Sequence, residues 1–291
     1  MITRIYRAGF TLIAIVCLCG WIAIPKNLNL WRFDDHPYGF ASEPQLIEDF
    51  SECTTGLASG LATPDGCPLL WKNRDVPSPT QEYHYVDHGG FPFIGLTYEN
   101  DIAKYFAGIN SVGFGIENSD AGNFPGPNAP GDQDDGATMS VALSTCQTVD
   151  DFQEILDSMN VNGRTRNYNY GTFDALGGAA MFECAGFSYT RFDAIEQEHG
   201  FMIRSNFSYT GSDTSDDDYS VGISRHDRAY IFWKAAVENN NLTPHYIYQQ
   251  VVRDLACREC DPYPLPFDGY YQNYLYGRVP VSYTHLRAHE T

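Results

Sequence analysis

The sequence predicts a layered α+β fold, in which strands and helices form separate blocks along the chain. From residue 53 onward, short apolar runs are separated by Gly, Pro, Asp and Asn, which is typical of strands joined by tight turns. Stretches with helical spacing follow in two places, with more strands between them. Blocks in this order fit a layered sandwich better than alternating βαβ units. With 43% hydrophobic and 19% charged residues, the 291-residue chain has the composition of one globular domain.

The first 25 residues have the pattern of an export signal. Arg4 and Arg7 precede an uncharged, largely apolar run that extends from residue 8 to residue 25. Its length lies near the roughly 20 residues that separate a cleavable signal from a membrane-spanning helix. No small-x-small cleavage site follows, so residues 1–25 are interpreted as either a signal peptide or a membrane anchor. We therefore expect an exported protein that is periplasmic, extracellular or membrane-anchored.

The segments on either side of the predicted domain are not expected to be part of its fold. Residues 26–52 form a polar stretch that is too short for a domain and is interpreted as a propeptide. Residues 281–291, VSYTHLRAHET, resemble the in-frame translation of a transposase adapter used in sequencing libraries, and they are excluded from fold reasoning. On this interpretation the domain occupies residues 53–280 and is incomplete at its C-terminus.

The individual elements are predicted from local pattern. Thr148 is a good N-cap residue for a helix with acidic residues in its first turn, and Gly177 and Gly178 mark the turn of a hairpin. The Pro- and Gly-rich stretch 121–136 is expected to be a surface loop beside the site. In chain order the predictions are strands at 57–62, 69–71, 91–98 and 114–116, helices at 138–144 and 149–159, a hairpin at 172–184, a strand at 201–209, and helices at 226–238 and 244–257.

Charge and cysteine spacing exclude several classes of partner. With 37 acidic and 18 basic residues the formal net charge is −19, which argues against a basic patch for nucleic acid or an anionic membrane. A neutral or cationic small molecule suits this charge better. The acidic run 213–218 does not match a calcium loop and is expected to be a solvated turn. Cys257 and Cys260 lack a second pair for zinc, so we expect a disulfide or two thiols there, and neither metal nor cofactor.

Cys53 is the candidate nucleophile. It precedes an apolar strand, and a turn at residues 64–66 leads to a second strand that ends in the charged segment 72–75. A thiolate is the reactive form of cysteine, and nearby cations lower its pKa. If the bond before Cys53 were cut, the freed α-amine, with an ordinary pKa of about 8, could serve as the base. A structural cysteine is one alternative, and a papain-like pair with His84 or His88 is another, although no sequence signature around Cys53 favours it.

A series of motifs in the right order from Cys53 to about Arg228 resembles the isopenicillin N acyltransferase family of N-terminal-nucleophile (Ntn) hydrolases, relatives of penicillin V acylase and choloylglycine hydrolase. The motifs are Cys53-Thr54-Thr55, Lys72-Asn73-Arg74-Asp75, the segment 108–116 (GINSVGFGI) followed by Glu117-Asn118, the segment 173–178 (FDALGG) with Glu183, Ser205-Asn206-Phe207, and Ser224-Arg225-His226-Asp227-Arg228. The resemblance implies an Ntn-hydrolase αββα four-layer sandwich, with two antiparallel sheets between helix layers and Cys53 at the start of a central strand.

The same resemblance implies five site residues. Cys53 would attack the amide carbon, with its own α-amine as base. Asp75 would hold that amine by a charge-assisted hydrogen bond. Asn118, or a neighbouring backbone N–H, would stabilise the oxyanion. Asn206 would contact the acyl carbonyl or the amine, and Arg225 would lie behind the cysteine and order the network.

The implied activity is autoproteolytic activation followed by cleavage of a linear amide through a thioester acyl-enzyme. Hydrolysis is favoured over acyl transfer, because water is abundant outside the cytoplasm and acyl-CoA is not. Candidate substrates are N-acyl amino acids, acylated lactones, β-lactam side chains and short peptides, and the alternative is an exported binding or structural protein on the same fold. Three departures from the family's patterns are Lys72 in place of Arg, Phe207 in place of His, and Glu52 in place of Gly.

Overall fold

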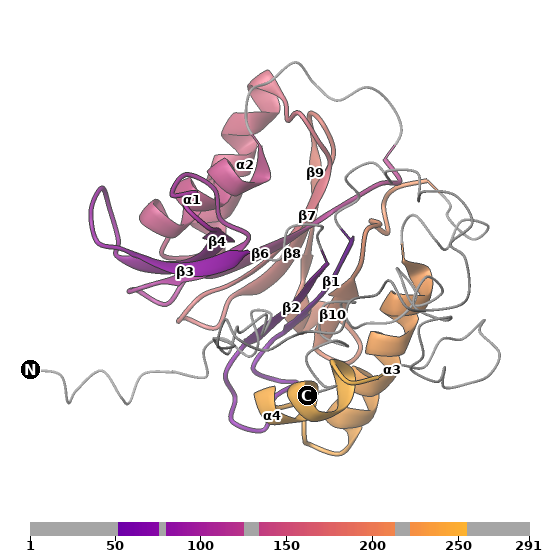
Figure 1. Ribbon diagram of the computed structural model, residues 1–291. Helices are drawn as coiled ribbons and strands as arrows, with labels where there is room; N and C mark the ends of the chain where they lie inside the picture. The colour runs from indigo at the N-terminus through magenta and orange to yellow at the C-terminus, as the bar shows by residue number, and fades with distance from the viewer. Residues whose placement is uncertain (1–51, 76–79, 125–133, 213–221, 255–291) are drawn as a thin grey trace, which may run out of the picture.

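The computed structural model describes residues 52–75, 80–124, 134–212 and 222–254, and it arranges them in four layers (Figure 1). Helices α1 (Asp135–Thr145) and α2 (Val149–Asn162) cover one face of a seven-stranded sheet. A three-stranded sheet packs on the opposite face, and helix α3 (Ile223–Glu238) covers its outer side. This order of layers confirms the predicted αββα sandwich.

Both sheets are antiparallel throughout the described residues. The small sheet has the order β10-β1-β2 and the large sheet the order β3-β4-β5-β6-β7-β8-β9. Their strands are β1 Glu52–Ala58, β2 Leu69–Asp75, β3 Gln81–Val86, β4 Phe93–Tyr98, β5 Ala107–Asn110, β6 Gly115–Asp120, β7 Tyr168–Phe173, β8 Ala179–Cys184, β9 Tyr189–Asp193 and β10 Phe201–Arg204. Strand β1 is therefore the central strand of its sheet, as the resemblance implied.

Alternation along β1 gives the small sheet two different faces, since successive side chains of a strand point to opposite sides. On the outer face, Ala58 and Trp71 pack against helix α3, where the rings of Trp71 and Trp233 lie 6.1 Å apart. On the inner face, Leu57 packs between the sheets with Met181 of β8. The second residue of β1, Cys53, shares the inner face with Leu57.

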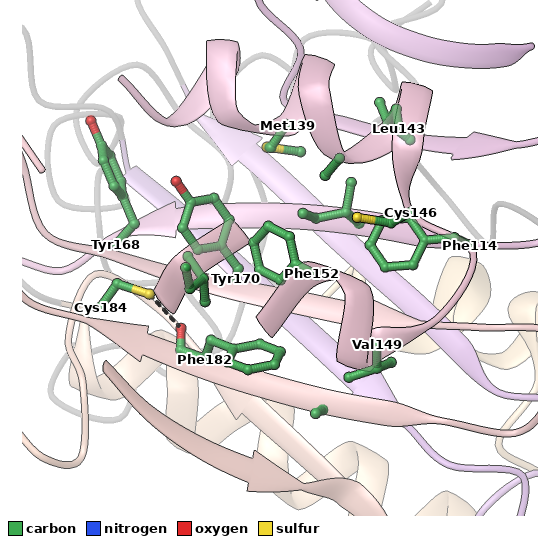
Figure 2. Packing of buried hydrophobic residues seen from close by; sticks show 14 of the residues in the cluster. Phe114, Met139, Leu143, Cys146, Val149, Phe152, Tyr168, Tyr170, Phe182 and Cys184 are labelled. Atoms are coloured by element: carbon green, nitrogen blue, oxygen red, sulfur yellow. Dashed lines mark hydrogen bonds between the residues drawn. The ribbon is translucent and has the colours of Figure 1, made fainter. Parts of the chain in front are cut away.

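The largest apolar cluster lies between the large sheet and helices α1 and α2, as Figure 2 shows. Phe152 of α2 is fully buried there and makes edge-on contacts with Tyr170 at 5.3 Å and Phe182 at 5.4 Å between ring centroids. Aromatic side chains in such pairs contribute packing energy beyond their buried area. This cluster joins helices α1 and α2 to the large sheet, on the face opposite the small sheet.

Local sequence fixes both ends of helix α2. Thr148 is its N-cap and accepts a hydrogen bond from the Asp151 N–H at 3.1 Å, while the Asp151 carboxylate accepts from the Thr148 N–H at 2.8 Å. This reciprocal pair is a capping box, which satisfies two backbone donors that a helix start leaves unpaired. Gly163 ends the helix at φ 80°, a conformation that glycine adopts without strain. The predicted N-cap is thus confirmed.

Several predicted boundaries were wrong. The strand expected at 57–62 begins earlier, at Glu52, so Cys53 lies within it. Strands β3 and β9 had no predicted counterpart, and β5 overlaps the segment 108–116, which resembles the family's strand-pair motif. The strand expected at 201–209 ends at Arg204, because the next backbone groups bond to side chains of the large sheet. The helix expected at 244–257 is a short turn, α4 (Pro244–Tyr246), followed by a π-helical turn, η4 (Ile247–Val251).

Some predictions fall on residues that the structure does not describe. These are the leader and propeptide up to residue 51, the acidic run 213–218, most of the predicted surface loop, and Cys257 with Cys260. Within the described ranges, no helix is long and apolar enough to cross a membrane. The same ranges contain no cluster of His, Cys, Asp or Glu side chains that could hold a metal ion.

Candidate active site

Strand pairing aligns Cys53 with a basic side chain of the neighbouring strand. In the register of β1 with β2, Cys53 lies across from Arg74, and Thr55 lies across from Lys72. Residues that are directly paired in an antiparallel ladder point to the same face, so all four side chains lie on the inner face, toward the large sheet. Cys53 is only 3% exposed. The candidate thiol is therefore in the interior of the sandwich, beside two basic residues.

Three of the five predicted site residues lie in direct contact. The backbone N–H of Cys53 donates to Asn206 Oδ1 at 2.8 Å. The Arg225 guanidinium donates from Nη2 to the same Oδ1 at 2.9 Å, and from Nη1 to the Cys53 carbonyl oxygen at 2.7 Å. Its Nη1 also lies 3.3 Å from Thr54 Oγ1. We call Cys53, Asn206 and Arg225 the cysteine clamp, because the backbone of Cys53 is held at both its nitrogen and its oxygen.

The two residues that hold Cys53 come from segments joined to each other. Asn206 follows strand β10, and Arg225 lies in the first turn of α3. Ser205 Oγ donates to the Gly222 carbonyl at 2.8 Å, which places the start of α3 next to Asn206. Gly222 has φ 70°, and a Cβ there would lie 2.1 Å from Arg225 Nη2. Glycine at this position therefore leaves the space that the guanidinium occupies.

Asn118 lies outside the cysteine clamp. By alternation in β6 its side chain shares a face with Ile116, which is buried under helices α1 and α2. Its amide nitrogen donates to Asp135 at the start of α1, and its Oδ1 accepts from Lys72 Nζ at 2.9 Å. Lys72 also donates to the Asn118 carbonyl oxygen. One of the two N–H donors of the Asn118 amide is thus used by Asp135.

Lys72 reaches Asn118 because strand β5 is short. The ladder between β5 and β6 begins at the pair of Ala107 with Glu117, so the last three residues of β6 extend past it.

The backbone of Asp75, the fifth predicted residue, lies at the end of β2 across from Glu52. The side chain of Asp75 lies outside the described part of the chain, and its role as an anchor for the amine stays a prediction.

Charged residues lie near the cysteine clamp at the C-terminal end of β6. They are Asp120, Asp135, Lys72, Arg74 and Arg166. Asp120, the last residue of the strand, accepts a hydrogen bond at its backbone oxygen from Asn206 Nδ2 at 3.4 Å. Burial raises the pKa of the Asp120 carboxyl to about 6, with the nearby Asp135 carboxylate acting in the same direction, while Arg166, Lys72 and Arg74 oppose the shift. Burial therefore favours the neutral form of Asp120 more than it does for an exposed aspartate.

Arg74, one of these charged residues, occupies an aromatic site. Its guanidinium lies over the ring of Phe106, 3.6 Å from the centroid, and Nη2 donates to Tyr98 Oη at 2.9 Å. Stacking on aromatic rings holds a guanidinium in one plane. The Lys-Asn-Arg-Asp motif therefore supplies two separately held cations on the face that carries Cys53.

Sequence reasoning missed Glu117 as a buried acid. Its side chain is 1% exposed, and it points between the sheets toward Lys72 and Thr55. Thr55 and the Gly171 N–H lie close, but neither carboxylate oxygen accepts a hydrogen bond of ordinary geometry. Burial raises the pKa of Glu117 to about 8, and Lys72 offsets part of the effect. The period of two along β6 was the signal that could have placed Glu117 on the inner face.

The two histidines of the papain-like alternative belong to other contacts. His84 lies in β3, an edge strand of the large sheet, and its Nε2 is 2.8 Å from Glu82 Oε1. His88 follows the same strand, is strongly exposed, and lies 3.7 Å from Asp87. In Figure 1, β3 and β1 lie in different parts of the sandwich. The described contacts give this alternative no support.

Comparisons with known proteins gave matches among solved structures. No family model matches the chain, and no curated protein matches it. A variant of conjugated bile acid hydrolase from Clostridium perfringens is 15% identical, with a TM-score of 0.44, over 65% of this chain and 74% of that chain. Penicillin V acylase from Agrobacterium tumefaciens is 15% identical, with a TM-score of 0.36, over 69% and 63%. A Caenorhabditis elegans ortholog of N-acylethanolamine-hydrolyzing acid amidase is 11% identical, with a TM-score of 0.44, over 66% and 89%.

Proposed function

We propose that this protein is an exported cysteine amide hydrolase that activates itself by cleaving the peptide bond between Glu52 and Cys53. The observation that supports it most directly is the cysteine clamp. Asn206 Oδ1 lies 2.8 Å from the Cys53 nitrogen, the atom that would become the catalytic amine. The resemblance of the motifs to Ntn hydrolases, stated above, supplies the class of reaction.

Self-cleavage begins with addition of the Cys53 thiol to the carbonyl carbon of Glu52. The carbon–nitrogen bond breaks and the nitrogen takes the thiol proton, which leaves Glu52 as a thioester on the sulfur and Cys53 with a free α-amine. Water then hydrolyses the thioester, so that Glu52 ends as a carboxylate and the thiol is regenerated. In this scheme the proton moves from the Cys53 thiol to the Cys53 nitrogen, so no added base is consumed.

Substrate hydrolysis repeats the same bond changes on an external amide. The Cys53 amine accepts the thiol proton as sulfur attacks the amide carbon, and it returns that proton to the leaving nitrogen. A thioester acyl-enzyme remains, and water releases the acid. Asn206 and Arg225 orient the amine and the Cys53 carbonyl throughout, which matters because displacement of reacting groups by about 1 Å costs large factors in rate. Asp75 is proposed as a second anchor for the amine.

Stabilisation of the oxyanion is proposed to fall to Asn118 or to a backbone N–H near it. Asn118 Nδ2 carries two N–H groups, and one of them donates to Asp135. Protonation of the Asp135 carboxyl would weaken that bond, and burial raises the pKa of this group above its usual range. The remaining N–H of Asn118 is the proposed donor to the oxyanion, and the charge on Asp135 affects how firmly the amide is held.

The test is intact mass measurement with N-terminal sequencing of the wild type, a Cys53→Ala variant and a Cys67→Ala control. Cys67 is a partly exposed thiol in the turn between β1 and β2, so its removal leaves the site unchanged. We expect a new N-terminus at Cys53 in the wild type and the control, and none in Cys53→Ala. The processed protein should then release the acid and the amine from an N-acyl amino acid. An uncut wild type would favour a non-catalytic protein on the same fold.

A further inference from the structure

The inner face of the large sheet carries a row of polar residues beneath Asn206. Strand register pairs Ser119 of β6 with Asn169 of β7, and Asn169 with Glu183 of β8. All three side chains are 1% exposed or less. Apolar groups such as Met181 lie on the same face, and so does the buried Glu117. Burying polar groups in such a place costs free energy unless they are hydrogen-bonded. We call Ser119, Asn169 and Glu183 the polar row.

The polar row binds the chain segment that contains Asn206. Asn169 Nδ2 donates to the carbonyl oxygen of Phe207 at 3.0 Å and lies 3.4 Å from that of Ser205. Ser119 Oγ donates to the same Ser205 carbonyl at 2.8 Å. The carbonyl of Asn206 itself points the other way and accepts from the Gly122 N–H at 2.8 Å. Hydrogen bonds therefore hold the backbone of residue 206 and of the residues on either side of it.

Glu183 holds the far end of the same segment. Its Oε1 accepts from the Tyr209 N–H at 2.8 Å, and its Oε2 accepts from the Thr210 N–H and hydroxyl at 2.8 Å and 2.6 Å. Oε1 also accepts from Arg204 Nε at 2.7 Å, just before the segment begins. The segment between Arg204 and Thr210 is thus closed at both ends by one carboxylate, and Asn169 bonds to it between them.

We propose that Asn169 is a positioning residue, which sets the direction of the Asn206 side chain toward the Cys53 nitrogen by binding the carbonyls on either side of residue 206. This inference deepens the proposed function and rests on it for its catalytic consequence. The positioning of Asn206 by Asn169 does not rest on the proposed function, because the contact between Asn206 and the Cys53 nitrogen is present in the uncut chain. A displaced segment would turn Oδ1 away from that nitrogen.

A kinetic experiment tests the catalytic consequence with Asn169→Leu, a substitution of similar shape without hydrogen bonds. We expect kcat to fall by roughly 10-fold or more, the equivalent of one or two hydrogen bonds, with little change in KM. The acidic limb of the pH profile of kcat/KM should move to lower pH, because Oδ1 stabilises the protonated amine. In an Asn206→Ala background, Asn169→Leu should add no further loss, whereas an additive loss would contradict the proposal.

The matched control is Asn123→Ala. Asn123 holds the same segment further on, by accepting from the Ser208 N–H and donating to the Ser208 carbonyl, both at 2.8 Å, but it does not bond on either side of residue 206. A role in general stability would lower activity in both variants to a similar extent and leave the pH profile in place. Ser119→Ala removes only the Ser205 contact and should give a smaller effect of the same kind if Asn169→Leu does not fold.

A second measurement separates failure of this inference from failure of the proposed function. In the Cys53→Ala background the chain stays uncut, and the amide proton of residue 53 reports its hydrogen bond to Asn206. We expect hydrogen exchange at this amide to accelerate about 10-fold or more when Asn169→Leu is added, and to stay unchanged with Asn123→Ala. Unchanged exchange in both variants would overturn the positioning role, whatever the activity of the wild type.

Discussion

The carboxamide oxygen of Asn206 accepts hydrogen bonds from a backbone amide and from a guanidinium, so a single atom connects the start of β1 to helix α3. The Cys53 carbonyl is bound by the other end of the same guanidinium. A planar, forked side chain suits this arrangement, since its nitrogens can serve two acceptors at a fixed separation. The position of the Cys53 backbone is therefore coupled to the geometry of Arg225.

Replacing Arg225 with lysine should show this coupling. A single ammonium cannot bind the Cys53 carbonyl and Asn206 in the same fixed geometry, so we expect the rates of self-cleavage and of amide hydrolysis to fall by about 10- to 100-fold, the cost of a charged hydrogen bond. Arg228→Lys is the control, because Arg228 lies on the same helix but pairs with Asp254. Equal losses in the two variants would show that helix α3, and not the clamp, is responsible.

Among single residues, the ones that the sequence revealed are those carried by short motifs. Cys53, Asn206 and Arg225 each stand in a recognisable local pattern, and they converge in space. Asn169 stands in no such pattern. Its partner Ser119 lies on β6, which is far from β7 in sequence, and pairing of that kind is decided by tertiary packing.

At the scale of elements, local signals predicted helices better than strands. Helix α2 was placed to within a few residues, because the two residues of its capping box, Thr148 and Asp151, lie close together in the sequence. Local pattern did not predict strand β5, which was expected only from the strand-pair motif at 108–116. Its sequence, Ala-Gly-Ile-Asn, contains residues with weak strand preference, and the strand pairs with a neighbour on each side. The four layers followed from the family resemblance, whereas the block order alone predicted only a layered α+β fold.

The contact between β1 and α3 leads to a prediction at the same scale. A Cβ on Gly56 would lie 2.5 Å from the indole of Trp233 and 2.9 Å from the Ile203 side chain. Gly56→Ala should therefore force the helix away from the sheet and lower the free energy of unfolding by about 1–3 kcal/mol, as overpacking of cores does. Urea unfolding would measure the loss. The same substitution in a Trp233→Leu background should cost less, and equal costs would exclude this steric cause.

At the scale of the whole molecule, the two sheets enclose charged groups as well as apolar ones. Arg204 of the small sheet and Glu183 of the large sheet form a buried ion pair with 2.7 Å between Nε and Oε1. Glu117 lies in the same interior with its pKa raised to about 8 by burial. We therefore expect the stability of the packed sheets to depend on pH.

The sign of this dependence follows from the direction of the shift. The folded protein keeps a proton on Glu117 that the unfolded chain loses above its ordinary pKa of 4.5, so stability should fall as pH rises from about 4.5 to 8. Glu117→Gln should remove this part of the slope and stabilise the protein at pH 8 by an amount on the order of a few kcal/mol. Urea midpoints at pH 5 and pH 8 measure it. Glu99→Gln, at an exposed carboxyl, is the control, and parallel pH curves for Glu117→Gln and wild type would contradict the assignment.

The central place of β1 has a consequence for what a cut at Glu52 would leave behind. Chain termini ordinarily fray, because their backbone groups have few partners. Here residue 53 has β2 on one side, Asn206 on the other and Arg225 at its carbonyl. A terminus created at this point would keep these contacts, so the new free amine would be as well ordered as an interior residue.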